Sequence, residues 1–265
     1  MTEPILKTPT ESYIEFAHVS KSFGEQPVLQ DVSFDVRRGE TVVVLGRSGV
    51  GKSVTLKHIL GFLMPDEGEV RVNGQNVEKM TEAELTEMRR KVTLVFQSGA
   101  LFDSLTVAEN VAYPLRERSM RSDADLGEEK IEESVRQLLG LVDLENVEEL
   151  MPSDLSTGMK RAVAIARALA AAPEAILYDE PTTMVDPLMA HTVGELILKL
   201  KRRRGLTSVV VTHDMKLARK LADRVVFLAE GRVAFFGPMS EMDSCPDTLI
   251  QEFIELDELS LEKLR

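Results

Sequence analysis

One run of eight residues, Gly46-Arg47-Ser48-Gly49-Val50-Gly51-Lys52-Ser53, has the residue types and the spacing needed to bind phosphate groups. It reads GxxxxGK[ST], follows the apolar run Thr41 to Leu45, and precedes a segment at about 54–60 that can be helical. In this context the glycines let backbone N–H groups face the β- and γ-phosphates, and the helix start adds partial positive charge. Lys52 would reach the β/γ oxygens, and the Ser53 hydroxyl would take one Mg²⁺ position. The loop predicts a nucleoside triphosphate site; a turn that binds nothing is the less favoured interpretation.

Two adjacent carboxylates end the apolar, strand-like run Ile176-Leu177-Tyr178-Asp179-Glu180. Asp179 at the strand tip would hold Mg²⁺, directly or through water, and Glu180 would polarise an attacking water. A solvated acidic strand end is a common alternative. The phosphate-binding loop favours the catalytic interpretation, because phosphoryl transfer needs a carboxylate that holds the metal.

Composition bounds the class of protein that carries these residues. The chain has 265 residues, 43% of them hydrophobic and 29% charged, which is typical of a soluble globular protein. Its net charge is −12 and its pI is near 5, so nucleic-acid binding and attraction to an anionic membrane surface are both disfavoured. The largest basic cluster, residues 201–204, ends a helix-like segment before Gly205, where cations suit the helix dipole.

Cysteine usage and hydropathy predict a cytosolic chain. Cys245 is the single cysteine, so no internal disulfide can form. The N-terminus shows no basic-then-apolar signal pattern, and no apolar run approaches 18 residues. If the protein works at a membrane, another polypeptide must supply the spans.

The predicted elements alternate between strands and helices around a helical insert. Short strands are predicted at 14–16 and 32–36, with Lys21-Ser22-Phe23-Gly24 between them. Later strands alternate with helical stretches, which indicates a largely parallel sheet. Residues 98–154 differ, because they begin as a loop and continue as helix-like segments with an amphipathic face. The strands that alternate with helices are 175–178, 208–212 and 224–228, and further short strands are predicted at 69–72 and 92–96.

The segment Leu155-Ser156-Thr157-Gly158-Met159 precedes an Ala-rich helix and lies shortly before Asp179. Taken alone it reads as an ordinary serine helix cap. With the other motifs in order it resembles the signature LSGGQ of the ABC-type ATPases, and departs from it at Thr157 and Met159. The resemblance implies that Ser156 and Gly158 face a γ-phosphate at a helix start.

Four further positions match elements of the same family. The resemblance implies that Gln97, at the end of its strand, senses Mg²⁺ and touches a membrane subunit. Asp186 matches the acid of the family's D-loop, and His213 follows a strand as the family's switch histidine does, contacting the γ-phosphate. Phe23 lies where the family stacks an aromatic ring on adenine, with a core phenylalanine as the competing interpretation. The other histidines are interpreted as structural: His18, His58 and His191.

The resemblance covers about residues 13–240 and implies an α/β fold with a RecA-like P-loop core, an N-terminal antiparallel β-subdomain and a helical subdomain at about 98–158. A nucleotide-binding domain would span 1–240, and a C-terminal helical tail would span 241–265. ATP and Mg²⁺ are the implied ligands. The implied assembly is a head-to-tail homodimer that drives integral-membrane permease subunits from the cytoplasmic face of the inner membrane, with each site completed by the other copy's signature.

A narrower resemblance concerns the cargo. Segments in the loop and helical insert are similar to the ATPase of the Mla-type, MCE-associated lipid transporters. This implies phospholipid transport between bacterial membranes, with an MCE-domain protein and a small accessory protein as possible further partners. The segments are 98–102, 110–117 and 151–156, with Met159.

Three alternatives remain open. The chain could power import or export of another substrate. A non-transport ABC ATPase is disfavoured because its long coiled coils or zinc modules are absent from this sequence. A regulatory nucleotide binder without hydrolysis is disfavoured because Lys52, Glu180 and His213 are all present.

The tail carries an amphipathic pattern. Leu249, Ile250, Phe253 and Leu256 approximate one helical face, with acidic residues opposite. So short a helix needs a surface to bury its apolar side. It could pack on its own domain, or dock on a second copy or a small accessory protein; Leu259, Leu261 and Leu264 would extend the stripe.

Overall fold

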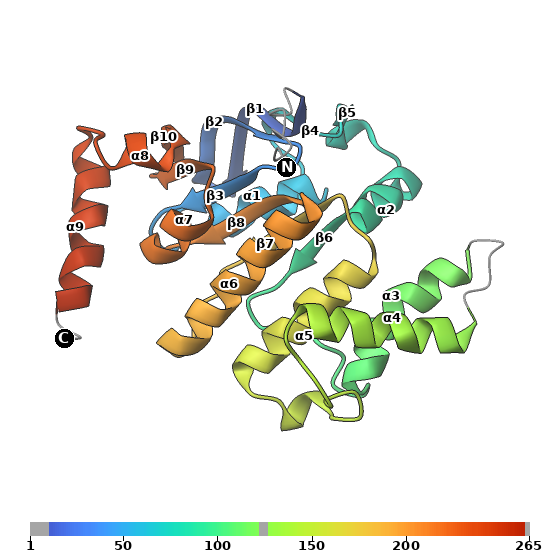
Figure 1. Ribbon diagram of the computed structural model, residues 1–265. Coiled ribbons are helices and arrows are strands. Elements are labelled where there is room, and N and C mark those ends of the chain that lie inside the picture. Colours follow the sequence, from blue (N-terminus) through green and yellow to red (C-terminus); the bar gives the residue numbers. More distant parts are fainter. Residues whose placement is uncertain (1–10, 122–126, 263–265) are drawn as a thin grey trace, which may run out of the picture.

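The computed structural model describes residues 11–121 and 127–262, with side chains up to Asp257. The first ten residues of the predicted nucleotide-binding domain lie outside these ranges, as do the last three of the predicted tail, which include Leu264. Leu259 and Leu261 lie in the last helix, beyond the described side chains. Figure 1 shows two sheets with helices around them and a separate group of helices below.

A six-stranded sheet carries the phosphate-loop strand among its central members, in the order β10-β9-β3-β8-β7-β6. Neighbouring strands are parallel except for β10, which pairs antiparallel with β9. All five residues of β3 are buried, as expected for a β-branched strand covered on both faces. The largely parallel sheet is therefore confirmed. Its strands are β3 (Thr41–Leu45), β6 (Val92–Val95), β7 (Ala175–Asp179), β8 (Thr207–Thr212), β9 (Arg224–Ala229) and β10 (Arg232–Pro238).

A second, antiparallel sheet of four strands lies above the first in Figure 1, in the order β2-β1-β4-β5. Its two longest strands exceed the prediction, because their pairing continues to Phe23 opposite Gln26. The turn end of this hairpin, residues 22–27, is exposed, so it lacks the apolar alternation that marks a strand in sequence. The strands are β1 (Ser12–Phe23), β2 (Gln26–Arg37), β4 (Glu67–Val72) and β5 (Gln75–Asn76).

Arg224 fastens the two sheets together near the start of β9. Its guanidinium donates to the carboxylate of Asp35 on β2 at 2.9 Å and to that of Glu40 at 2.5 Å. The hydrogen bond from Arg224 holds the pKa of Asp35 below its usual value. A planar fork between two carboxylates is geometrically selective. The contact therefore fixes the antiparallel sheet against the strand beside the phosphate loop.

The helical insert forms a lobe of its own, at the lower right of Figure 1. It contains α3 (Val107–Ser119) and α4 (Glu128–Leu141), and α5 (Thr157–Ala170) leads from it back to the parallel sheet. The predicted amphipathic face of α4 is buried, at Ile131, Val135, Leu138 and Leu139. The lobe therefore places the start of α5, where Ser156 lies, away from the antiparallel sheet.

Of the remaining helices, α6 and α7 connect strands of the parallel sheet, α1 and α2 link the two sheets, and α8 and α9 follow the last strand. Thr81 and Glu84 form a capping box at the start of α2, and Gly205 ends α6 in the left-handed region at φ 58°. No helix of the described ranges is long and apolar enough to cross a bilayer. The helices are α1 (Lys52–Ile59), α2 (Glu82–Lys91), α6 (Pro187–Arg204), α7 (Met215–Leu221), α8 (Met239–Met242) and α9 (Thr248–Glu262), with short 3₁₀ turns at Val77–Lys79 and Pro152–Asp154.

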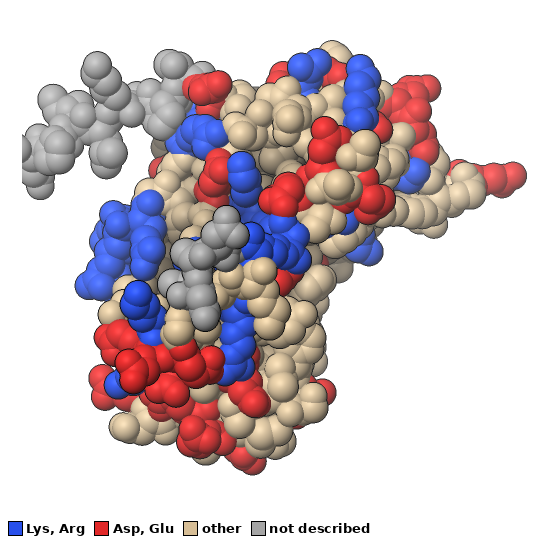
Figure 2. Space-filling view, turned by 90° about the vertical axis from the view of Figure 1, so that its right-hand side faces the viewer, with Lys and Arg blue, Asp and Glu red and all other residues tan. Residues whose placement is uncertain are grey.

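The face seen in Figure 2 carries side chains of both signs. Cations along α2 and α3 are paired with carboxylates. Arg90 pairs with Glu87, Arg121 with Glu117, and Arg116 with Glu128 at the start of α4. Such exposed pairs contribute little stability.

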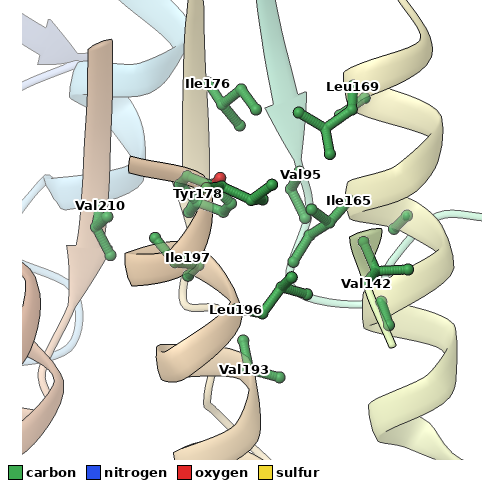
Figure 3. Close-up of a cluster of buried hydrophobic side chains, with 14 of the residues drawn as sticks. Val95, Val142, Ile165, Leu169, Ile176, Tyr178, Val193, Leu196, Ile197 and Val210 are labelled. Atoms are coloured by element: carbon green, nitrogen blue, oxygen red, sulfur yellow. The ribbon is translucent and has the colours of Figure 1, made fainter. Parts of the chain in front are cut away.

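A continuous apolar core joins α5 and α6 to the parallel sheet (Figure 3). Ile165 and Leu169 of α5 point toward β6 and β7, and Leu196 and Ile197 of α6 lie below Tyr178 of β7. Each fully buried side chain of this kind contributes about 1.5–3 kcal/mol relative to an exposed one. This packing fixes the carboxyl end of β7, from which Asp179 and Glu180 project.

The tail helix α9 buries part of its apolar side on its own domain. Ile250, Phe253 and Ile254 belong to the main core cluster, and the rings of Phe253 and Phe227 lie 5.1 Å apart, edge to face. This supports the interpretation that the tail packs on its own domain. Leu249 and Leu256 remain exposed on the same helix, so docking on a second copy stays a prediction.

Replacing Phe253 by alanine is expected to lower the free energy of unfolding by about 3 kcal/mol, because the change leaves a cavity against Phe227. Leu256→Ala is the matched control, since that side chain is 55% exposed and the expected change is within about 0.5 kcal/mol. Denaturant unfolding of both variants checks this. Equal stabilities would mean that α9 does not pack on its own domain.

Candidate active site

The phosphate-binding loop between β3 and α1 forms the floor of a cavity of ≈ 320 Å³. Gly46 cannot be replaced without displacing the backbone, because a Cβ there would lie 2.4 Å from the carbonyl oxygen of Leu228. Gly51 has a φ of 103°, which L-residues rarely adopt, and precedes the first turn of α1. The cavity is lined by Val28, Ser48, Gly49, Gly51, Lys52, Ser53, Val54, Gln97, Glu180, Thr183 and His213.

The ammonium group of Lys52 lies inside the loop, with only 5% of the side chain exposed. It donates to the carbonyl oxygens of Gly46 at 2.8 Å and Arg47 at 3.1 Å. It also lies 3.3 Å from Oε1 of Glu180. A phosphate bound over the loop would meet this cation together with the N–H groups at the start of α1.

Ser53 and Asp179 meet beside the loop, although 126 positions separate them in the sequence. The Ser53 hydroxyl donates to Oδ1 of Asp179 at 2.8 Å. Burial raises the pKa of Asp179, while the Ser53 hydrogen bond and the Lys52 charge oppose that rise. Gln97 follows β6 and lines the same cavity. These oxygen atoms suit Mg²⁺, which takes few protein ligands and completes its octahedron with water and phosphate oxygens.

No cluster of three or more metal-binding His, Cys, Asp or Glu residues occurs in the described ranges. A site of one hydroxyl and one carboxylate agrees with Mg²⁺ held mainly by phosphate oxygens, and it does not resemble an all-protein metal cage. The residues present therefore fit the predicted ion.

Glu180 lies deep in the cavity and is held from three directions. Its Oε2 accepts from the Thr183 hydroxyl at 2.9 Å and lies 2.9 Å from Nδ1 of His213. Its Oε1 faces Lys52, and the side chain is 13% exposed. This arrangement offers a fixed carboxylate to a water molecule next to a bound phosphate, as general-base catalysis requires.

Eight predicted site residues are not among those that line this cavity: Gly46, Arg47 and Val50 of the loop, Asp179 beside it, and four residues on other elements. Ser156 caps α5, where its hydroxyl accepts from the Met159 N–H at 3.2 Å. Gly158 is in the first turn of the same helix, and Asp186 caps α6. Phe23 ends β1 with 48% of its surface exposed, so the competing interpretation as a core residue is wrong. The three histidines interpreted as structural also lie outside the lining, in β1, α1 and α6.

Some residues at the site carry no signal in the sequence. Thr183 reaches Glu180 only because the chain turns back after β7, and Val28 enters the cavity from β2. Arg47 of the loop lies 3.6 Å from Glu252 of α9. Arg161 of α5 is buried against the backbone that follows β7. An apolar pattern cannot predict these contacts, because those of Val28, Arg47 and Arg161 join segments that are distant in sequence, and that of Thr183 depends on the shape of the turn.

Comparison with known proteins places this geometry in a family. The profile of the family described as ABC transporter matches residues 29–183. The chain is 40% identical to the chloroplastic protein TRIGALACTOSYLDIACYLGLYCEROL 3 of Arabidopsis thaliana, over 94% of this chain and 75% of that protein. It is 35% identical to the intermembrane phospholipid transport system ATP-binding protein MlaF of Escherichia coli (strain K12), over 91% of this chain and 88% of that protein.

Relatives with another printed role are comparably similar. The methionine import ATP-binding protein MetN of Clostridium tetani is 35% identical, over 93% of this chain and 76% of that protein. Among solved structures, the dimeric ATP-binding cassette MJ0796, in a post-hydrolysis state with ADP and Pi, matches with a TM-score of 0.76 and 34% identity. That match covers 85% of this chain and 98% of the other. The predicted α/β P-loop fold is confirmed, and the chain belongs to the ABC transporter family as one of its ATPases.

Proposed function

We propose that this chain is the ATP-hydrolysing subunit of a phospholipid transporter and works as a head-to-tail homodimer on a membrane permease. The observation that carries the hydrolytic part is the placement of Glu180 between Lys52 and His213 at the wall of the phosphate cavity. A degenerate site that only binds nucleotide does not require a carboxylate fixed between a lysine and a histidine.

In the proposed reaction, Lys52 and the loop N–H groups orient the β- and γ-phosphates. Ser53 and Asp179 would hold Mg²⁺, with Gln97 beside them; the ion supplies charge stabilisation on the phosphate oxygens. Glu180 takes a proton from the attacking water, while His213 holds the carboxylate and faces the γ-phosphate. Phe23 is proposed to stack on the adenine ring, since it lies exposed at the end of β1.

The dimer follows from the residues that lie outside the cavity. Ser156 and Gly158 begin a helix, and a helix start captures anions, yet neither residue lines the phosphate site of its own chain. A two-fold arrangement would bring them, with Asp186, to the nucleotide of the partner copy. The similar cassette MJ0796 is described as dimeric, which supports this assembly.

Cargo and location are proposed from the relatives. MlaF is named for intermembrane phospholipid transport, so we assign phospholipid as cargo, with the chain at the cytoplasmic face of the inner membrane through its permease. An MCE-domain protein and a small accessory protein are proposed further partners. The similarity to MetN makes methionine import the specific alternative.

The cargo is tested on the complex isolated from native membranes in lipid nanodiscs through a tag on this chain. With phospholipid as cargo, ATP is expected to drive transfer of a fluorescent phospholipid between the complex and acceptor vesicles, and methionine is expected to leave ATP turnover unchanged. Turnover stimulated by methionine, without lipid transfer, would instead assign the complex to import of that amino acid. The Glu180→Gln complex is the control for transfer that does not depend on hydrolysis.

A further inference from the structure

Arg161 is a buried arginine on α5 that reaches the backbone around Glu180. Its side chain is 3% exposed, and burial lowers its pKa. Nη1 donates to the carbonyl oxygen of Glu180 at 3.1 Å, and Nη2 donates to that of Thr183 at 2.5 Å. A buried guanidinium is costly unless such acceptors satisfy it. Both acceptors belong to the turn that carries the proposed general base.

That turn has a conformation that needs support. Glu180 has a φ of 47°, in the left-handed region that residues with a side chain rarely adopt. On one side its N–H donates to the carbonyl oxygen of Val211 on β8 at 2.9 Å. On the other side its carbonyl oxygen accepts from Arg161 and from the Thr183 N–H at 3.2 Å. The backbone of Glu180 is thus held between a strand of the parallel sheet and α5.

The helix that carries Arg161 is itself firmly seated. Ile165 and Leu169 follow Arg161 at i+4 and i+8 on the same helix face, and Figure 3 shows both pointing toward β6 and β7. At the helix start, a Cβ on Gly158 would lie 1.7 Å from Cε of Met189, so α5 packs tightly against α6. The guanidinium therefore reaches the turn from a rigid support.

We propose that Arg161 is a positioning residue for ATP hydrolysis, which fixes the backbone of Glu180 so that its carboxylate points at the attacking water. The inference rests on the proposed function of Glu180. It also gives α5 two tasks in the proposed dimer. The first turn of α5 would contact the nucleotide bound by the partner copy, while Arg161 holds the glutamate that serves its own site.

The test uses the full chain with Arg161→Met, which keeps most of the volume and removes the donors, and Arg161→Lys, which keeps one charged donor. Arg161→Met is expected to lower kcat for ATP hydrolysis by about 10²-fold, the effect typical of a misplaced catalytic group. KM for ATP is expected to stay unchanged, because Arg161 does not line the nucleotide cavity. Arg161→Lys is expected to recover part of the lost kcat.

A purely structural role predicts a different pattern. If Arg161 only supported the start of α5, Arg161→Met in a Glu180→Gln background would also lose ATP-driven dimer formation, and that result would overturn the proposal. Near wild-type kcat in both variants would overturn it too. Should the methionine variant fail to fold, Arg161→Lys decides alone. A lowered kcat at unchanged KM would support the proposal, and an unchanged kcat would contradict it.

The matched control is Arg136→Met on α4, where the arginine is 59% exposed and lies 3.5 Å from Glu133. Its turnover is expected to equal that of the wild type. The two hypotheses fail separately: normal turnover of Glu180→Gln would contradict the proposed function, whereas an inactive Glu180→Gln with a normal Arg161→Met would contradict only the role of Arg161.

Discussion

Glu180→Gln is expected to bind ATP with unchanged affinity, to hydrolyse it about 10²–10⁴-fold more slowly, and to accumulate as an ATP-bound dimer. The amide keeps the shape of the side chain and can still pair with Thr183 and His213. It cannot accept a proton from water. Lys52 and Ser53 remain in place, so loading of the nucleotide is preserved while the chemical step is lost.

Single-turnover hydrolysis and gel filtration with ATP would measure the two effects. Glu195→Gln is the matched control. Glu195 lies on α6, where its carboxylate pairs with Lys220 of α7, and it does not line the cavity. Turnover of Glu180→Gln at a near wild-type rate would show that another group accepts the proton, and the assignment of Glu180 would be wrong.

Ser156→Arg is expected to abolish turnover while leaving the ATP affinity of the dilute monomer nearly intact. Ser156 caps α5 at the surface and does not line the phosphate cavity of its own chain. In the proposed dimer it faces the partner's γ-phosphate, so a long cation there would block closure without blocking loading. Loss of the cap itself costs about 1 kcal/mol, which is too little to unfold the domain.

Equilibrium binding of a fluorescent ATP analogue to the monomer measures nucleotide binding separately from dimer closure. Ser134→Arg, the same change on α4 in the helical lobe, is the control and is expected to keep turnover. A large loss of monomer affinity in Ser156→Arg, absent from the control, would place Ser156 in its own subunit's site and would contradict the head-to-tail arrangement.

The local chemistry of the site could be predicted from the sequence, because short motifs carry it. The phosphate-binding loop needs glycines at fixed spacing, and the apolar pattern on either side of it predicts the flanking strand and helix. The same holds for the Thr81 capping box and for the buried face of α4. The prediction was weaker for the turn end of the β1–β2 hairpin, residues 22–27, since this exposed part is held by backbone pairing that leaves no apolar alternation.

The motifs also indicated that Ser53 and Asp179 both serve a Mg²⁺ site, and the structure joins them by a hydrogen bond. Their distance across the sequence does not matter, because parallel strands bring their carboxyl ends to one edge of the sheet. The sequence by itself thus determined the fold class and the nature of the ligand.

Only the tertiary structure decided how the catalytic turn is held and where the tail lies. Arg161 looks like any charged residue of an amphipathic helix, and its burial against Glu180 depends on the seating of α5 on β6 and β7. Phe253 could have covered a second copy, and it packs on Phe227 instead. Side-chain periodicity predicts that a helix face will be buried. The surface that covers this face depends on the packing of the whole chain, which no local pattern encodes.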